Sequence, residues 1–232
     1  MLRLAAKMNL VRTIAGLWIS LSLLLEYFFS SGVIGYISHW ENGRGYIAAG
    51  SHPALLAWAI ASIALFVCLL KVEVEEFPAG VPSGWRRFFA FLIDFWFSLA
   101  ILASLGGTVP LWIESIRTGH FSWHFERNFS VPSDEIYGIP LVLITMALMF
   151  LYFVWPLTNG KQTVGSFIMR LRVAPPFGMR GAFTFRQAVR RVWLELTGMG
   201  SFLLRRSDRD SQGRTWYDRE TNSTVVLVKY EE

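Results

Sequence analysis

The sequence Gly84-Trp-Arg-Arg-Phe-Phe-Ala-Phe-Leu-Ile-Asp-Phe-Trp-Phe-Ser-Leu-Ala100 decides the fold, because two arginines lead directly into a long apolar run that carries one carboxylate, Asp94. Seven residues separate Arg87 from Asp94, so on a helix both side chains leave the same face, about 10 Å apart along the axis. Ala90 and Ser98 lie one turn to either side of Asp94. Small residues at that spacing let another helix approach closely, which predicts a membrane helix whose packing face holds one acid.

The composition is typical of membrane proteins, since 53% of the 232 residues are hydrophobic and 16% are aromatic. One cysteine, Cys68, excludes an internal disulfide. The net charge is +5, and the basic residues cluster beside apolar segments. That arrangement indicates anionic lipid headgroups and membrane orientation as its cause, and not binding to nucleic acid.

Four apolar runs predict four transmembrane helices. Three lie at about 14–37, 53–70 and 139–155, and the remaining one begins at Arg87 and fades past Gly106-Gly107 and Pro110. The first run is longer than the apolar core of a signal peptide and lacks an Ala-x-Ala cleavage site, so we expect a retained helix. Glu26 lies inside it. An acid there is a functional group, a partner for polar atoms of another helix, or an interfacial residue on a tilted span.

The distribution of lysine and arginine predicts the orientation of these spans. With the amino terminus in the cytoplasm, only Arg44, Arg117 and Arg127 of the 22 basic residues fall in the outer loops. Cytoplasmic segments of membrane proteins carry an excess of lysine and arginine. We therefore expect a multi-pass protein of the plasma (inner) membrane, with both termini in the cytoplasm.

The tail from Lys161 onward contains no fifth regular span, because arginines interrupt each of its apolar runs. Alternating residues at 169–173 and a second run at 224–228 predict two short strands that pair. Thr184 and Gln187 form a capping box before an amphipathic helix, with Arg186 and Arg190 opposite its apolar residues. This helix lies on the membrane surface or packs against the chain's own spans.

The predicted architecture is an all-α integral membrane protein with four transmembrane helices and a cytoplasmic tail that holds an amphipathic helix and short β-strands. An acidic linker rich in proline and glycine, residues 72–84, is the best internal boundary. It divides an amino-terminal transmembrane hairpin with its linker, residues 1–80, from a second domain, residues 81–232, that holds two spans and the tail.

Several motifs in fixed order resemble the RDD family of membrane proteins. They are Arg87-Phe-Phe-Ala-Phe-Leu-Ile-Asp94, Thr163-Val-Gly165, Leu171-Arg-Val173, Phe185-Arg-Gln-Ala-Val-Arg-Arg191, and Asp218 before Thr224-Val-Val226. The resemblance covers about 81–229 and leaves the amino-terminal helix pair outside it. It implies that Arg87, Asp94 and Asp218 are the signature residues.

The same resemblance makes Thr163 and Gly165 secondary candidates, beside Glu26 and the two small neighbours of Asp94. The Thr-x-Gly element of the family is usually completed by proline and lysine, and here Val164 and Ser166 stand in those positions. The family implies a transport role, with cation/proton exchange proposed for some members.

Side-chain direction suggests how the signature residues pair. Helical side chains lean toward the amino terminus, so Asp94 points toward Arg87 while Arg87 points away from it, toward the cytoplasmic surface. A direct pair between them would be strained. We therefore predict that Arg87 meets an acid of the tail, Asp218, and that Asp94 stays in a desolvated site.

Two function classes remain open at this point. One is a transporter of a small ion or solute that uses Asp94, and four spans would then require an oligomer or a membrane-protein partner to line a path. The other is a non-catalytic accessory or assembly protein that docks a partner through its tail. No enzyme is expected, because no phosphate-binding loop or nucleophile–base pair is present in the sequence, and no cofactor is expected. His120 and His124 lack a third ligand, so no metal site is expected either.

Overall fold

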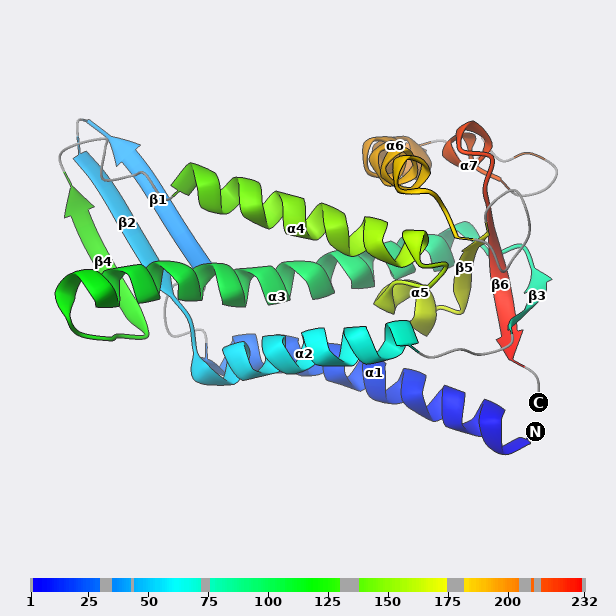
Figure 1. Cartoon of the computed structure of the whole chain (residues 1–232), viewed down its shortest axis with the longest axis horizontal. Helices are drawn as coiled ribbons and strands as arrows, with labels where there is room; N and C mark the ends of the chain where they lie inside the picture. The colour runs from blue at the N-terminus through cyan, green and yellow to red at the C-terminus, as the bar shows by residue number, and fades with distance from the viewer. Residues whose placement is uncertain are drawn as a thin grey trace. The chain divides into compact units, whose positions relative to one another are not determined.

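The computed structural model describes residues 2–29, 35–42, 44–71, 76–129, 138–174, 182–204, 210 and 214–230. Its helices are α1 (Leu2–Phe29), α2 (Pro53–Lys71), α3 (Gly84–Thr118), α4 (Gly138–Thr158), α5 (Val164–Ile168), α6 (Phe185–Leu204) and α7 (Trp216–Glu220) (Figure 1). Its strands are β1 (Gly35–Glu41), β2 (Arg44–Gly50), β3 (Glu76–Gly80), β4 (His124–Phe129), β5 (Leu171–Ala174) and β6 (Thr224–Tyr230). The chain is mostly helical, but the expectation of an all-α fold with strands only in the tail is wrong.

Two helices are long and apolar enough to cross a membrane, Gly84–Thr118 and Pro140–Thr158. Two shorter apolar helical stretches, Asn9–Leu25 and Pro53–Cys68, correspond to the other two predicted spans. About 20 apolar residues are needed to cross the hydrocarbon core. The described residues therefore contain two spans of full length, and the four-span topology stays a prediction.

The boundaries of two predicted helices differ from those observed. The first apolar run continues in sequence to Ile37, but α1 ends at Phe29 and β1 begins at Gly35, where each residue pairs with one of β2. Periodicity alone does not separate a short apolar strand from a helix end. The third helix does not end near Pro110, because it continues to Thr118. Tertiary packing overrides the local cost of a proline there, and Leu111, which follows it, is buried.

The chain divides into two compact units. One comprises residues 17–67 and 96–149 and holds the sheet β1-β2-β4. Asn42 has a φ of 51° in the turn between β1 and β2, where Glu41 faces Arg44, as a two-residue hairpin requires. Indole N–H groups connect its helices, since Trp18 donates to Ser62 Oγ at 2.8 Å.

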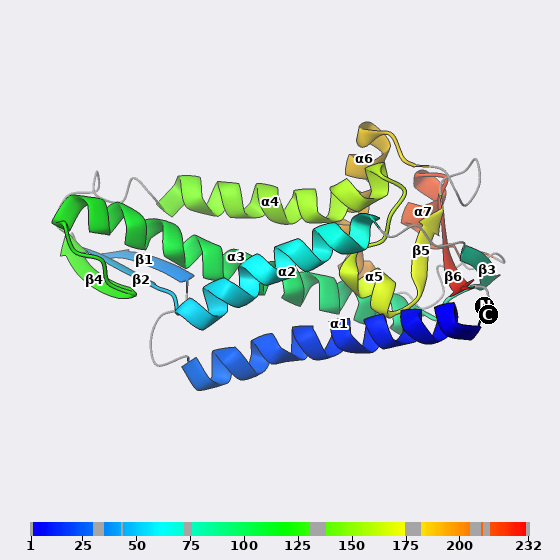
Figure 2. The ribbon, with the colours of Figure 1, turned by 60° about the horizontal axis from the view of Figure 1, so that its bottom comes forward.

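The other unit comprises residues 1–16, 68–95 and 150–232. Its sheet has the order β3-β6-β5, and both pairings are antiparallel. The predicted pairing of the two tail strands is confirmed, with Leu171 opposite Leu227 and Ala174 opposite Thr224. The third strand, β3, comes from the predicted linker, where no strand was expected. In Figure 2, α5 lies beside β5 and the first turns of α1.

One core cluster of this second unit is formed by α4, α6 and Phe183, which lies two residues before α6 begins. Val154 and Leu157 of α4 pack against Phe183, Ala188 and Val192. The capping box at the start of α6 is present, because the backbone N–H of Thr184 donates to Gln187 Oε1 at 3.0 Å. A side chain that caps a helix in this way fixes where the helix begins, and hence which of its residues face the core.

Candidate functional site

Asp94 lies on α3 with only 3% of its surface exposed, and its carboxylate accepts three hydrogen bonds from one stretch of chain. Oδ1 accepts from the Tyr152 hydroxyl at 2.6 Å and from the Gly165 backbone N–H at 2.7 Å. Oδ2 accepts from the Thr163 hydroxyl at 2.5 Å. Asp94 therefore faces protein, as predicted, and joins α3 to α4 and to the start of α5.

Gly165 is the closest point of this approach. A Cβ at this position would lie 2.1 Å from the Ala90 backbone oxygen and 2.9 Å from Asp94 Cγ, and both distances are shorter than atoms tolerate. Thr163 is the N-cap of α5, and its hydroxyl also accepts from the Ser166 backbone N–H. The Thr-x-Gly motif thus supplies a hydroxyl, an N–H group and the space that Asp94 needs.

Ala90 and Ser98, which flank Asp94 on α3, are each 3% exposed. The predicted packing face around Asp94 is therefore present. Glu26 lies within α1, but its side chain falls outside the part of the structure that is described.

Asp218 lies at the start of α7, is fully buried, and binds two arginines. Arg87 Nη1 donates to Oδ2 at 2.6 Å, which confirms the predicted pair, and Arg191 Nη1 donates to Oδ1 at 2.8 Å. The backbone N–H of Thr215 donates to Oδ2 at 3.0 Å and completes a capping box. Burial alone would raise the pKa of Asp218, but Arg191 and Arg87 lower it to about 2.

Arg191 of α6 was not singled out from the sequence, although it is as buried as Asp218. Its Nη1 also donates to the hydroxyls of Thr221, at 3.4 Å, and Ser223, and its guanidinium lies 5.7 Å from the centre of the Tyr217 ring. The signal was present: Arg191 falls on the apolar side of α6, one turn after Ala188. An arginine on the apolar side of a helix is buried, and a buried charge requires a partner of opposite charge.

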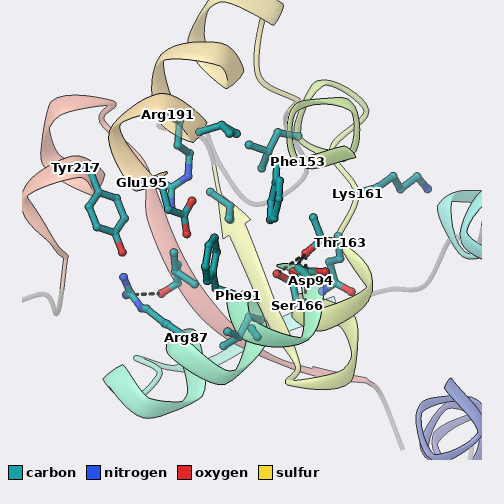
Figure 3. Close-up of a pocket in the computed structure, with 17 residues that line it drawn as sticks. Arg87, Phe91, Asp94, Phe153, Lys161, Thr163, Ser166, Arg191, Glu195 and Tyr217 are labelled. Carbon is teal, nitrogen blue, oxygen red and sulfur yellow. Dashed lines mark hydrogen bonds between the residues drawn. The ribbon is translucent and has the colours of Figure 1, made fainter. Parts of the chain in front are cut away.

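A cavity of about 60 Å³ lies within the unit that comprises residues 1–16, 68–95 and 150–232 (Figure 3). Its charged lining residues are Arg87, Asp94, Lys161, Arg191 and Glu195. One water molecule occupies about 10–15 Å³ of such a cavity, so this cavity has room for a few waters or one small ion. Polar lining groups and enough space allow the exchange of a proton or an ion.

The histidines in the loop after α3 form no such site. His120 and His124 are exposed, and His124 Nε2 lies 3.2 Å from Glu126 Oε1. Among the described residues, no group of three or more His, Cys, Asp or Glu side chains is arranged to hold a metal ion.

Helices of membrane-spanning length, together with two ionised arginines and an aspartate held in the interior, define a membrane protein that keeps charge inside its fold. The family model of the RDD family matches residues 81–219, more than half of the chain, and the chain belongs to this family. The match includes Arg87, Asp94 and Asp218 and leaves residues 1–80 outside. Searches among curated proteins and among solved structures find no match to this chain.

Proposed function

We propose that this RDD protein transports a small ion or solute across the plasma (inner) membrane, with Asp94 as the coupling group. The observation that supports the proposal is the cavity that Asp94 lines together with other charged side chains, on a helix long enough to cross a membrane. Ionisable residues within membrane helices are costly and are found on substrate and ion pathways.

The hydrogen bonds of Asp94 suggest how coupling works. An ionised carboxylate accepts hydrogen bonds on both oxygens, whereas a protonated one gives up acceptor capacity and gains a donor. Thr163 and Gly165 both donate to Asp94, so protonation or cation binding there weakens the bonds that hold the start of α5. The charge on Asp94 and the position of residues 163–165 then change together.

The topology that belongs to this proposal has four spans and both termini in the cytoplasm. It is supported by the excess of lysine and arginine in the segments assigned to the inside. Single cysteines placed at Ser122 and Ser211, in a chain without Cys68, test it by labelling in intact cells. Ser122 should react with an impermeant thiol reagent and Ser211 should not; labelling of Ser211 from outside rejects the topology.

Flux measured in sealed liposomes tests the transport function. Purified protein is reconstituted, a proton or monovalent-cation gradient is imposed, and internal pH is followed with a trapped dye. Flux should exceed that of empty liposomes, and Asp94→Asn should abolish it, while Glu126→Gln removes an exposed acid and serves as the control. Flux equal to that of empty liposomes for every cation rejects the proposal.

A second candidate function, a non-catalytic accessory or assembly protein, is favoured by the outer side of α6. Phe185 and Trp193 are 63% and 62% exposed there, and Arg186 is exposed beside them. Aromatic and arginine side chains in this arrangement suit a surface against anionic lipid headgroups or another membrane protein. A photo-reactive residue at position 193 that crosslinks one defined protein, in a chain that shows no flux, would support this second function.

A further inference from the structure

Three carboxylates lie in or beside the cavity, and they differ in how firmly they are held. Asp94 accepts three hydrogen bonds, and Asp218 binds Arg87, Arg191 and the backbone N–H of Thr215. To change partner, either group must give up several bonds at once. Each of them is therefore coupled to the position of a neighbouring segment.

Glu195 of α6 is different. It is half-buried and lines the cavity, yet its carboxylate forms no hydrogen bond or ion pair with any residue in the described part of the chain. Its charge interacts at longer range with Arg191, one turn earlier on α6, and with Asp218 and Arg87. Glu195 can gain or lose a proton without breaking a contact between segments.

The groups around Glu195 favour a carboxyl that changes charge. Arg87 and Asp94 face the cavity from α3, Lys161 from the segment after α4, Arg191 from α6 and Tyr217 from α7, with Asp218 behind the arginines. Burial raises the pKa of Glu195, Arg191 lowers it, Asp218 raises it and Arg87 lowers it, so that the net shift is upward. The pKa of Tyr217, raised to about 12 by burial and by Glu195, keeps that phenol neutral.

The rings of Phe91 and Phe153 lie between Glu195 and Asp94 in the view of Figure 3, and their centroids are 5.8 Å apart. Glu195 is on the side of Arg191 and Tyr217, whereas Asp94 is on the side of Thr163. The cavity therefore has two acidic positions with an aromatic pair between them. Within the described part of the chain, Glu195 accepts no hydrogen bond, whereas Asp94 accepts three.

On the basis of the proposed transport function, we propose that Glu195 is the proton-exchange group of the cavity and passes protons between water and Asp94. Uptake forms an O–H bond on the Glu195 carboxylate and breaks one on a hydronium ion, which leaves as water. Release to cavity water reverses these two changes. The hydronium ion formed in the cavity then gives its proton to Asp94, where an O–H bond forms as one on the hydronium ion breaks. A change of charge on Asp94, and not on Glu195, moves α5, because the three donors to Asp94 must then rearrange.

Infrared difference spectroscopy of the protein in liposomes tests this inference without requiring transport. Spectra recorded across a pH step should contain the carbonyl band of a protonated carboxyl group in the parent chain. Because Asp94 also takes up a proton, the band has more than one component; Glu195→Gln should remove one component and Glu195→Asp should shift that component. Glu220→Gln, which removes an exposed acid of α7, should leave it unchanged.

Flux in the same liposomes separates this inference from the proposed function. If the parent chain transports, Glu195→Gln should slow proton flux on the order of 100-fold, the scale that a positioned acid–base group contributes, and Glu195→Asp should restore most of it. Spectra in which Glu195→Gln removes no component of the band overturn the inference, and so does unchanged flux in that variant. Absence of flux in the parent chain rejects transport, and the infrared band alone then decides whether Glu195 exchanges protons.

Discussion

Replacing Gly165 with alanine tests whether the contact between α5 and Asp94 holds this unit together. The added Cβ would lie 2.1 Å from the Ala90 backbone oxygen, and a backbone atom cannot turn aside as a flexible side chain can. The start of α5 must therefore move away from α3. The Gly165 N–H then loses its 2.7 Å hydrogen bond to Asp94 Oδ1.

The size of the effect follows from these two losses. Overpacking a well-filled site costs about 1–3 kcal/mol. Loss of a hydrogen bond to a charged group costs about 1.5–3 kcal/mol more. We expect Gly165→Ala to lower the free energy of unfolding by at least about 3 kcal/mol, which lowers the Tm of a chain of this length by roughly 6–12 °C.

Thermal unfolding of the purified protein in detergent, followed by tryptophan fluorescence and by elution volume after heating, measures this change. Gly106→Ala is the matched control, because Gly106 lies within helix α3 and a Cβ there meets nothing within 4 Å. The control should leave the Tm unchanged or raise it, since alanine is favoured over glycine in helices by up to about 1 kcal/mol. Equal Tm values for the two variants would refute the reasoning.

Three further predictions concern the charge cluster around Asp218. Arg191→Met should lower the free energy of unfolding by about 3–5 kcal/mol, because it leaves a buried carboxylate with one arginine. Arg190→Met removes an exposed pair and should lower the free energy of unfolding by at most about 1 kcal/mol. Equal Tm values for the two variants contradict the buried cluster. Arg87→Ala and Asp218→Ala remove the same contact, so the double variant should be less protease-sensitive in membranes than the sum of the singles, and strict additivity argues against coupling. Burial would raise the pKa of Asp218, but Arg191 and Arg87 lower it to about 2, below the value of about 3.9 in the unfolded chain. The ionised carboxylate therefore stabilises the fold fully above about pH 4, and this stabilisation is lost as the pH falls toward 2. Asp218→Asn should flatten the Tm between those pH values; an acid slope equal to that of the parent chain would show that another group is responsible.

The sequence predicts the long helices well because membrane-length apolar runs are a strong signal, and α2 and α4 begin and end within a few residues of their predicted limits. The sheet β1-β2-β4 could not be predicted in the same way. Its first strand continues an apolar run without a break in composition, and its third strand pairs with a segment about 80 residues earlier. Pairing over that distance leaves no local pattern.

The residues of the candidate site also differ in whether a local pattern in the sequence predicts them. The direction in which helical side chains lean, a local property of α3, argues against a pair between Arg87 and Asp94, and the family resemblance supplied Asp218 as the partner that Arg87 binds. The donors to Asp94 depend on how the segment after α4 folds back toward α3. Thr163 and Gly165 were therefore found only through the family motif, and Tyr152 was not predicted to bind Asp94. Glu195 has no hydrogen-bonded partner among the described residues, so no pairing pattern in the sequence points to it.

The contact between Arg12 and α5 shows that the family match does not coincide with the folded unit. Arg12 Nε donates to the Phe167 carbonyl oxygen at 2.9 Å, and its guanidinium lies 5.2 Å from the centre of the Phe167 ring. Nearby, Arg170 Nη2 donates to Asn9 Oδ1 at 2.7 Å. The five residues of α5 are thus held at one end by Asp94, inside the matched segment, and at the other by a helix that precedes it. A fragment cut at the edge of the match would lack an integral piece of its own fold, so the modular unit of this protein is discontinuous in sequence and includes its first 16 residues.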